Sequence, residues 1–240
     1  MLKKILLALT APLRYLIRYE IKRAVLLLRE NHDIHAALER RALESTAEYV
    51  EKNMLSVDSV DSHRALLTKA LREADLSGNK LICEFGVFSG ASINHIASHT
   101  ASTVFGFDSF KGLPTRWREG YDKGHFALFP PSEFQKNVKL VTGWFDQTLP
   151  IFLREHREDV CFIHMDCDLY SSTKTVLTLL KERIKPGCII VFDEYFNYPG
   201  WEEGEDKAFR EFINETGLKY EYLGYNRNHA QVAVKIKASS

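Results

Sequence analysis

Residues 81–92 read LICEFGVFSGAS, an apolar run followed by a turn that contains two glycines. This run predicts a short buried strand, and the residues after Gly90 predict a helix whose first N–H groups are free to bind a ligand. Gly86 and Gly90 are spaced G-x-x-x-G, which differs from the G-x-G-x-x-G of dinucleotide sites. Glu84 at the strand tip would repel a pyrophosphate and attract an ammonium or sulfonium group. Glycines that serve only packing are the alternative explanation of this motif.

Strand-like and helical stretches alternate after this turn, which is typical of βαβ units and a parallel sheet. The further strand-like runs lie at 103–107, 138–142, 160–166 and 188–193, and the helical stretches lie near 91–98, 147–156, 171–184 and 202–216. The last two strand-like runs, 219–225 and 230–237, are joined by a short loop and are expected to pair antiparallel. Together with 80–85, these runs predict an α/β, Rossmann-like fold with a mostly parallel seven-stranded sheet and an antiparallel C-terminal strand.

The N-terminal residues differ from the rest of the chain in charge. Residues 1–30 contain seven Lys or Arg and two Glu, a net charge of +5, so the other 210 of the 240 residues carry −5 in a neutral chain. Apolar side chains over 2–29 recur with a helical period and predict a basic amphipathic helix. We expect residues 1–60 to form an N-terminal helical extension, with a helix over Ile34–Asn53. Residues 61–240 are expected to form the main domain, which begins with a helix over Ser62–Ala74.

The composition also limits the partners and the compartment. A neutral chain gives no sign of a nucleic-acid partner, which normally requires a basic excess. Four cysteines without a C-x-x-C pair indicate a reducing, cytoplasmic compartment. The longest uncharged stretch near the N-terminus, Ile5–Leu13, is much shorter than the roughly 20 residues that span a bilayer, and no cleavage site of a signal peptide follows it. The basic helix is therefore expected to contact either the inner face of a membrane or a neighbouring subunit of a homo-oligomer.

An acidic residue also ends the second strand of the predicted sheet. Asp108, in the stretch GFDSFKGLP (106–114), lies 24 residues after Glu84. Nucleoside-binding α/β folds place an acid that accepts from the ribose hydroxyls at this point. The spacing favours ribose binding, and an Asx-type turn is the alternative because Asp–Ser pairs often form one.

The third strand is followed by GWFDQTLP (143–150), in which aromatic and acidic side chains are adjacent. The ring of Trp144 or Phe145 could stack on an adenine, and Asp146 could accept a hydrogen bond from the exocyclic amine. Asp146 could equally be the N-cap of the following helix, and the two roles are compatible.

Carboxylates are concentrated after the fourth and fifth strands. They are Asp166, Asp168, Asp193 and Glu194. The carboxyl ends of neighbouring parallel strands converge on one crevice, where acids without matching Lys or Arg repel one another unless a cation lies among them. Oxygen donors alone indicate Mg²⁺ or a similar hard ion. A helix cap and a solvated acid would be the alternative for a single Asp. His164, inside a strand, is more simply explained as a core residue than as a ligand.

The stretch Lys111–Gln135 has neither a helical nor a strand period and is rich in Gly, Pro and aromatic residues. Long loops of this kind in compact domains are usually functional, so we expect a lid over residues 111–137. His125 within it is a candidate general base.

Several motifs in the same order resemble those of the macrocin/mycinamicin-type (TylF-like) sugar O-methyltransferases, a family of class I S-adenosylmethionine-dependent enzymes that use Mg²⁺. The motifs are GFDSFKGLP (106–114), GWFDQTLP (143–150), HMDCDLYSSTKTVL (164–177), IIVFDEYFNYPGW (189–201) and GYNRNHAQVAV (224–234). The resemblance runs from about Asn79 to Lys237 and implies the class I methyltransferase fold. Residues 1–60 do not match the antibiotic-tailoring members of the family.

The resemblance also implies roles for individual residues. The methionine moiety of S-adenosylmethionine would be surrounded by Glu84, Gly86, Phe88, Gly90 and Ser92. Asp108 would bind the ribose, and Gly143, Phe145 and Asp146 would surround the adenine. The metal ligands would be Asp166, Asp193 and Glu194, of which Glu194 replaces the more usual second Asp.

The resulting hypothesis is an O-methyltransferase that acts on a hydroxyl of a sugar or another hydroxylated small metabolite with the help of Mg²⁺. Asp166 is the first candidate for the proton acceptor, followed by Asp168 and His125. A nicotinamide-dependent Rossmann oxidoreductase is an alternative, although the glycine spacing and Glu84 disfavour it. A non-catalytic, membrane-peripheral nucleoside-binding protein is the other alternative, and it would leave the acidic cluster without an explanation.

Overall fold

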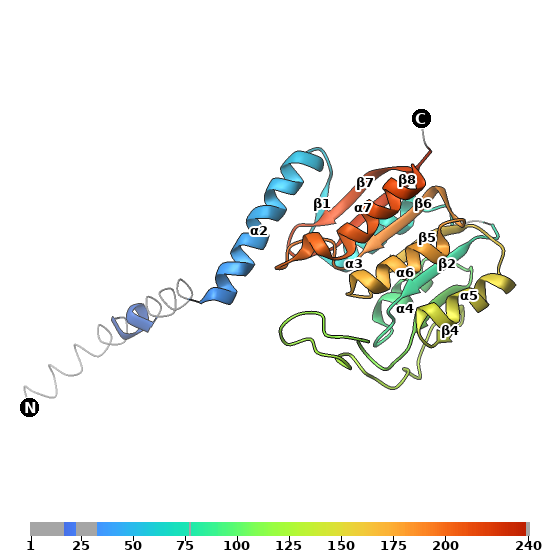
Figure 1. Cartoon of the computed structure of the whole chain (residues 1–240), viewed down its shortest axis with the longest axis horizontal. Coiled ribbons are helices and arrows are strands. Elements are labelled where there is room, and N and C mark those ends of the chain that lie inside the picture. Colours follow the sequence, from blue (N-terminus) through green and yellow to red (C-terminus); the bar gives the residue numbers. More distant parts are fainter. Residues whose placement is uncertain (1–16, 23–32, 77, 239–240) are drawn as a thin grey trace, which may run out of the picture.

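The computed structural model describes residues 17–22, 33–76 and 78–238 (Figure 1). Residues 17–22 are helical and exposed, and the rest of the helix expected over 2–29 lies outside the described residues. No helix in the described ranges combines the length and the apolar character needed to cross a membrane.

Eight strands form one sheet in the order β1-β7-β8-β6-β5-β2-β3-β4. Their bounds are Ser59–Val60 (β1), Leu81–Phe85 (β2), Val104–Asp108 (β3), Val138–Thr142 (β4), Val160–Met165 (β5), Ile184–Phe192 (β6), Lys219–Asn226 (β7) and Val232–Lys237 (β8). Strand β8 runs antiparallel to β6 and β7, and all other neighbours are parallel. The predicted mostly parallel sheet with an antiparallel C-terminal strand is therefore confirmed. The eighth strand, β1, was not expected because two residues are too few to show a period.

Helices cover both faces of the sheet (Figure 1). They are α2 (Ile34–Asn53), α3 (His63–Glu73), α4 (Ala91–Ala97), α5 (Phe145–Glu155), α6 (Tyr170–Leu180), the 3₁₀ turn η1 (Trp201–Glu203) and α7 (Glu205–Thr216). Buried side chains of α3 and α4 pack in one core cluster, and those of α5, α6 and α7 pack in the other. Successive strand residues alternate between the two clusters. Phe162 and Ile189 pack with α3 and α4, whereas Ile163 and Ile190 pack with α5, α6 and α7.

Helix α2 has the bounds expected from the sequence and begins at Asp33, whose carboxylate accepts from the amides of His35 and Ala36. It packs on the main domain through apolar side chains such as Ala42 and Val50 and through polar contacts. The indole Nε1 of Trp201 donates to Ser45 Oγ at 2.9 Å, and the Thr46 hydroxyl accepts from the amide of Asn197. These contacts fix α2 against the loop and the η1 turn that follow β6.

Register aligns the carboxyl ends of three central strands. Phe85 of β2 is paired with Met165 of β5, which is in turn paired with Phe192 of β6. The residue that follows each strand, which is Gly86, Asp166 or Asp193, therefore lies at the same level of the sheet. Backbone hydrogen bonds of 2.9 Å continue the ladder from Asp166 N to Phe85 O and from Asp193 N to Met165 O. The sheet itself thus brings a glycine turn and two carboxylates together.

Candidate active site

A cavity of about 570 Å³ lies at the carboxyl ends of these strands. Its lining combines the glycine turn, the acidic strand ends, the start of α5 and α6, and part of the lid. The predicted site residues among them are Gly86, Phe88, Asp108, Phe145, Asp146, Asp166, Asp168, Asp193 and Glu194. One crevice therefore holds most of the candidate residues, as expected at the carboxyl ends of an open parallel sheet.

The glycine turn approaches the neighbouring strand so closely that only glycine fits at its first position. Gly86 has φ +94°, and a Cβ there would overlap the backbone carbonyl of Asp166. Asp108 braces the same turn, since its Oδ2 accepts from the amides of Val87 (2.8 Å) and Phe88 (2.9 Å). Its Oδ1 accepts from the amide of Phe110 at 2.7 Å, which is the Asx turn considered above. Asp108 thus forms that turn and also lines the cavity.

Glu84 lies beneath the glycine turn and is fully buried. Its Oε1 accepts from the Ser92 hydroxyl at 3.0 Å, and its Oε2 lies 3.1 Å from His164 Nδ1. Burial raises the pKa of Glu84, and the hydrogen bonds from His164 and Ser92 oppose that rise. Neither Glu84 nor Ser92 is among the cavity-lining residues, so the structure places both as supports of the turn. Gly90, where an added Cβ would meet the Phe134 ring, also lies outside the lining.

Aromatic and acidic side chains of α5 form another wall of the cavity. The Phe145 ring meets Phe85 edge-on at a centroid distance of 5.5 Å, and Asp146 is exposed in the first turn. The N-cap of α5 is Trp144, so the suggestion that Asp146 could cap this helix is wrong. An acid in the first turn is still favoured by the helix dipole. Gly143 supports this wall from behind, with its amide donating to Asp108 O at 2.9 Å.

The carboxylates on the cavity floor repel one another. Burial, followed by the charges of Asp193 and Asp168, raises the pKa of Asp166 well above its usual range. Burial and the Asp193 charge raise the pKa of Asp168 to about 7, against a lowering by Arg118. Burial, followed by the charges of Asp193 and Asp166, raises the pKa of Glu194 well above its usual range. These raised pKa values show that burial and mutual repulsion outweigh the positive charge of Arg118.

The donor set fits a hard cation. Asp166, Asp193 and Glu194 each offer an oxygen, and these three oxygens lie within 4.8 Å of one another. Glu194 Oε2 is buried and has no hydrogen-bond partner within the part of the chain described, which is costly unless a cation satisfies it. Carboxylate oxygens alone suit Mg²⁺ better than zinc. The three residues thus have the chemistry expected of a magnesium site.

Glu205, the first residue of α7, is a fully buried neighbour of this cluster that the sequence interpretation missed. It accepts from the Glu194 amide at 3.0 Å and from the Thr173 hydroxyl at 3.3 Å. Its carboxylate therefore orients the backbone that carries Glu194. The acidic run Glu202–Asp206 offered no signal for this burial, because acids at a helix start are usually solvated.

The lid stretch Lys111–Gln135 contains no regular helix or strand, as expected from its lack of a period. Phe126 lines the cavity, but the exposed side chain of His125 does not and instead packs edge-on against Phe126 at 4.4 Å. The Arg118 guanidinium lies over the rings of Trp117, Tyr121 and Tyr198. In this arrangement His125 is the candidate base that the structure does not bring into the crevice.

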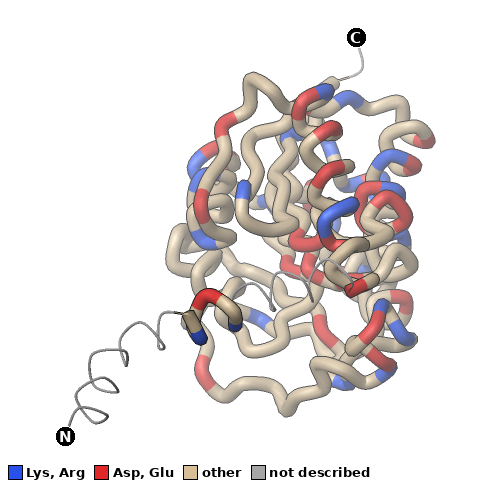
Figure 2. Tube along the Cα trace, turned by 90° about the vertical axis from the view of Figure 1, so that its left-hand side faces the viewer, with Lys and Arg blue, Asp and Glu red and all other residues tan. Residues whose placement is uncertain are grey.

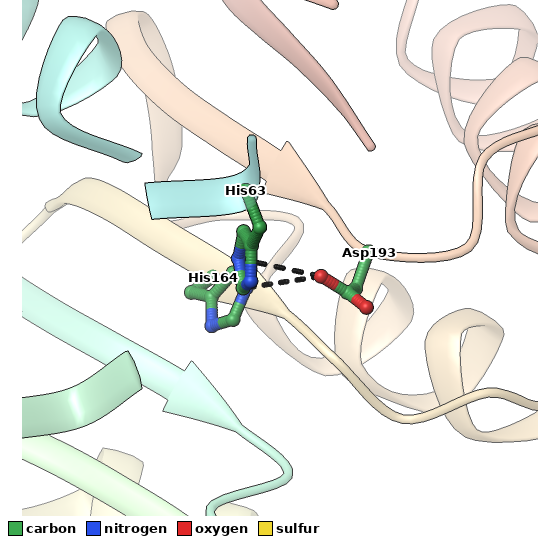
Figure 3. Close-up of side chains that lie close together, drawn as sticks. All are labelled: His63, His164 and Asp193. Carbon is green, nitrogen blue, oxygen red and sulfur yellow. Dashed lines mark hydrogen bonds and ion pairs between the residues drawn. The ribbon is translucent and has the colours of Figure 1, made fainter. Parts of the chain in front are cut away.

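Two histidines, His63 and His164, lie beside the Asp193 carboxylate and extend the polar network (Figure 3). His63 Nε2, in the first turn of α3, lies 3.1 Å from His164 Nε2 and 3.3 Å from Asp193 Oδ1. Burial and the neighbouring His164 lower the pKa of His63 to about 4. His63 was not singled out from the sequence, where nothing connects it to a residue 101 positions away.

Comparison with known proteins agrees with this geometry. Residues 83–195 match a family model described as a methyltransferase domain. Among solved structures, the calicheamicin methyltransferase CalS11 superimposes with a TM-score of 0.58 at 23% identity, covering 72% of this chain and 77% of that chain. The O-methyltransferase NovP superimposes with a TM-score of 0.54 at 21% identity, covering 73% and 77%. The fold is therefore that of the class I, Rossmann-like methyltransferases, and the matched domain includes the glycine turn and the acidic strand ends.

Two sequence relatives are O-methyltransferases from Streptomyces. Demethyldecarbamoylnovobiocin O-methyltransferase of Streptomyces niveus is 25% identical, over 58% of this chain and 62% of the relative. The 8-demethyl-8-(2,3-dimethoxy-alpha-L-rhamnosyl)-tetracenomycin-C 4'-O-methyltransferase of Streptomyces olivaceus is 27% identical, over 48% of this chain and 52% of the relative. The chain thus matches less than two thirds of the length of either relative.

Proposed function

We propose that this protein transfers a methyl group from S-adenosylmethionine to a hydroxyl of a sugar or a similar hydroxylated small metabolite, with assistance from Mg²⁺. The observation that carries the proposal is the single cavity that joins the glycine turn and Asp108 to the carboxylates Asp166, Asp193 and Glu194. The match of residues 83–195 to a methyltransferase domain supports it.

For the methyl donor, the residues divide into lining and support. Gly86 and Phe88 would lie along the methionine moiety, Asp108 would accept from the ribose, and Phe145 and Asp146 would flank the adenine. Four residues outside the lining would support the shape and charge of the donor site from behind, namely Glu84, Gly90, Ser92 and Gly143. The bound donor supplies a methyl group on a sulfonium, which is already activated for transfer.

The chain's own residues then align the acceptor, exclude water and accept a proton. An acceptor oxygen forms a bond to the methyl carbon as the carbon–sulfur bond breaks, which leaves S-adenosylhomocysteine. The hydroxyl proton passes to a carboxylate, and the candidates are Asp166 and Asp168, which both line the cavity. His125 is a weaker candidate because movement of the lid would be needed to bring it there.

Asp166, Asp193 and Glu194 would hold the cation. When bound, Mg²⁺ would lower the pKa of an acceptor hydroxyl and neutralise the clustered charge. The residues around it then position the acceptor, and Glu205 keeps Glu194 in place through the Glu194 amide.

The substrate class rests on two supports. The motifs resemble the macrocin/mycinamicin-type (TylF-like) sugar O-methyltransferases, and one relative is named for a methyltransfer to a rhamnosyl derivative. A ring with neighbouring hydroxyls suits the site because two oxygens could bind one cation. A nicotinamide-dependent activity is disfavoured by the G-x-x-x-G spacing, and a purely binding role would leave the cavity-floor acids without a purpose.

Within the same proposal, residues 1–60 form an accessory extension to the catalytic domain 61–240. The basic residues 1–30 contact an anionic membrane surface or a second subunit of a homo-oligomer in the cytoplasm. Co-sedimentation with anionic liposomes, with and without residues 1–30, separates these two roles.

Transfer of radiolabel from methyl-labelled S-adenosylmethionine to a panel of glycosides, nucleotide sugars and catechols tests the activity. We expect turnover that EDTA abolishes and Mg²⁺ restores, and that Asp193→Asn lowers at least about 100-fold, as removal of charged transition-state stabilisation does elsewhere. Asp159→Asn is the matched control, because Asp159 is exposed at the opposite end of β5. Turnover that is insensitive to EDTA and to Asp193→Asn would overturn the role of the metal.

A further inference from the structure

A cluster of mixed nitrogen and oxygen donors adjoins the acidic site and shares Asp193 with it. His63, His164 and Asp193 come from α3, β5 and the end of β6, and one ligand atom of each lies within 4.8 Å of the others. Figure 3 shows both imidazole rings beside the same carboxylate oxygen. The three residues are thus brought together by the tertiary fold.

The spacing of the three atoms matches a metal site. His63 Nε2 and His164 Nε2 are 3.1 Å apart, and Asp193 Oδ1 lies 3.3 Å from the first and 4.0 Å from the second. Ligand atoms around a tetrahedral zinc ion with bonds of roughly 2.0–2.1 Å are about 3.3–3.4 Å apart. A cation could therefore bind all three atoms with only small side-chain movements.

A carboxylate behind the cluster orients one of the rings. Glu84 Oε2 lies 3.1 Å from His164 Nδ1, so Nδ1–H donates to Glu84 and the Nε2 lone pair faces His63 and Asp193. A metal-bound histidine usually donates its other ring N–H to a carboxylate, a backbone carbonyl or a water molecule, and this partner fixes the tautomer and increases ligand basicity. Ser92 holds Glu84 in turn at 3.0 Å.

The cluster is incompletely satisfied without an ion. Asp193 Oδ1 is buried but has no well-aligned hydrogen-bond donor among the residues described. The lone pairs of His164 Nε2 and Asp193 Oδ1 therefore share at most the single Nε2–H of His63. The His63 side chain is 30% exposed, which leaves a path for an ion to enter.

We propose that His63, His164 and Asp193 form a second metal site that binds a divalent transition-metal ion of the zinc type. Imidazole nitrogens select such an ion over Mg²⁺, whereas the neighbouring oxygen-only set selects Mg²⁺. The ion would tie the first turn of α3 to the carboxyl ends of β5 and β6. Because Asp193 belongs to both sets, the ion would also fix a residue of the acidic site.

Cobalt(II) is a suitable probe because nitrogen-rich sites of low coordination number give intense visible absorption, whereas six oxygen ligands give weak absorption. The full-length protein, without a histidine tag and stripped with EDTA, is titrated with Co²⁺ and then with Zn²⁺. We expect an intense band that saturates near one equivalent and is lost on addition of Zn²⁺.

Variants locate the site. His63→Ala and the bulkier His63→Gln should both lose the band, and Asp166→Asn should keep it because Asp166 belongs only to the oxygen set. His99→Ala is the matched control, since His95 and His99 lie one turn apart, with ring centroids at 4.5 Å, and could bind Co²⁺ by themselves. The control should keep the band.

Thermal unfolding provides a second readout, which also shows that the variants fold. Zn²⁺ should raise the melting temperature of the wild-type protein and of His99→Ala, but not that of either His63 variant. A band and a Zn²⁺ shift that persist in both His63 variants, or that disappear in His99→Ala, would overturn the proposal.

Discussion

Replacing Gly86 with alanine tests whether the close approach of the glycine turn to β5 builds the candidate site. An alanine Cβ at this position would lie 2.7 Å from the Asp166 carbonyl carbon and closer still to its oxygen. Carbon atoms in normal contact are about 3.5–4.0 Å apart, so relieving the carbon contact alone requires the turn or the Asp166 backbone to move by roughly 1 Å, and the shorter contact with the oxygen requires more. That movement would displace a candidate metal ligand and the walls of the donor crevice together.

Gly187 provides a matched control. Its φ of +97° is close to the +94° of Gly86, but an added Cβ would meet no atom within 4 Å. Gly187→Ala should therefore lower the free energy of unfolding only by the cost of a strained backbone, about 1–3 kcal/mol. Gly86→Ala should lower the free energy of unfolding by that amount and by about 1–3 kcal/mol more, because the added methyl group overpacks the turn.

Urea unfolding measures the difference in stability, and calorimetry with S-adenosylhomocysteine measures the effect on the site. We expect Gly86→Ala to be the less stable variant by about 1–3 kcal/mol and to lose most of its binding, whereas Gly187→Ala binds like the wild type. Equal stability and equal binding of the two variants would refute the proposed close approach.

Two further perturbations address the walls and the floor of the cavity. Asp108→Asn should weaken S-adenosylhomocysteine about 10- to 150-fold in calorimetry, since one charge-assisted hydrogen bond contributes about 1.5–3 kcal/mol; unchanged affinity would exclude Asp108 from the ribose site. The pKa of Asp168 is raised from 3.8 to about 7 in the folded protein, so Asp168 binds a proton more tightly in the native state than in the unfolded state. The stability of the metal-free protein should therefore fall as the pH rises from about 4 to about 7. In urea unfolding with EDTA, the free energy of unfolding of Asp168→Asn should rise relative to that of the wild type by up to about 1.4 kcal/mol per pH unit between about pH 4 and 7. Mg²⁺ should reduce this rise. A difference in stability that does not change with pH would contradict the raised pKa of Asp168. The two proteins must be compared because His63, whose pKa is lowered to about 4, makes stability rise with pH below its usual pKa. This effect is the same in both proteins and cancels in the difference.

The sequence predicted the elements whose signal is local. The run 81–92 contains a complete strand, a turn and the start of a helix, so periodicity and glycine spacing sufficed. The position of Asp108, Asp166 and Asp193 at one edge of the sheet could be predicted, because each ends or follows an apolar strand and parallel strands end at one edge.

Contacts between distant segments could not be predicted in the same way. Nothing in the sequence connects His63 with His164, because their contact depends on how α3 packs across the sheet. Glu84 was expected to face the ligand, yet it is buried beneath the turn, where Ser92 and His164 bind it. Acids at a helix start are usually solvated, so the sequence gives no sign that Glu205 is buried, as it is in the structure.

Binding of S-adenosylhomocysteine to the full-length protein, measured by calorimetry beside NAD under the same conditions, tests the central claim most directly. The crevice at Gly86 and Asp108 predicts binding of one S-adenosylhomocysteine per chain and no measurable binding of NAD. Binding of NAD without S-adenosylhomocysteine, or of neither, would contradict the account.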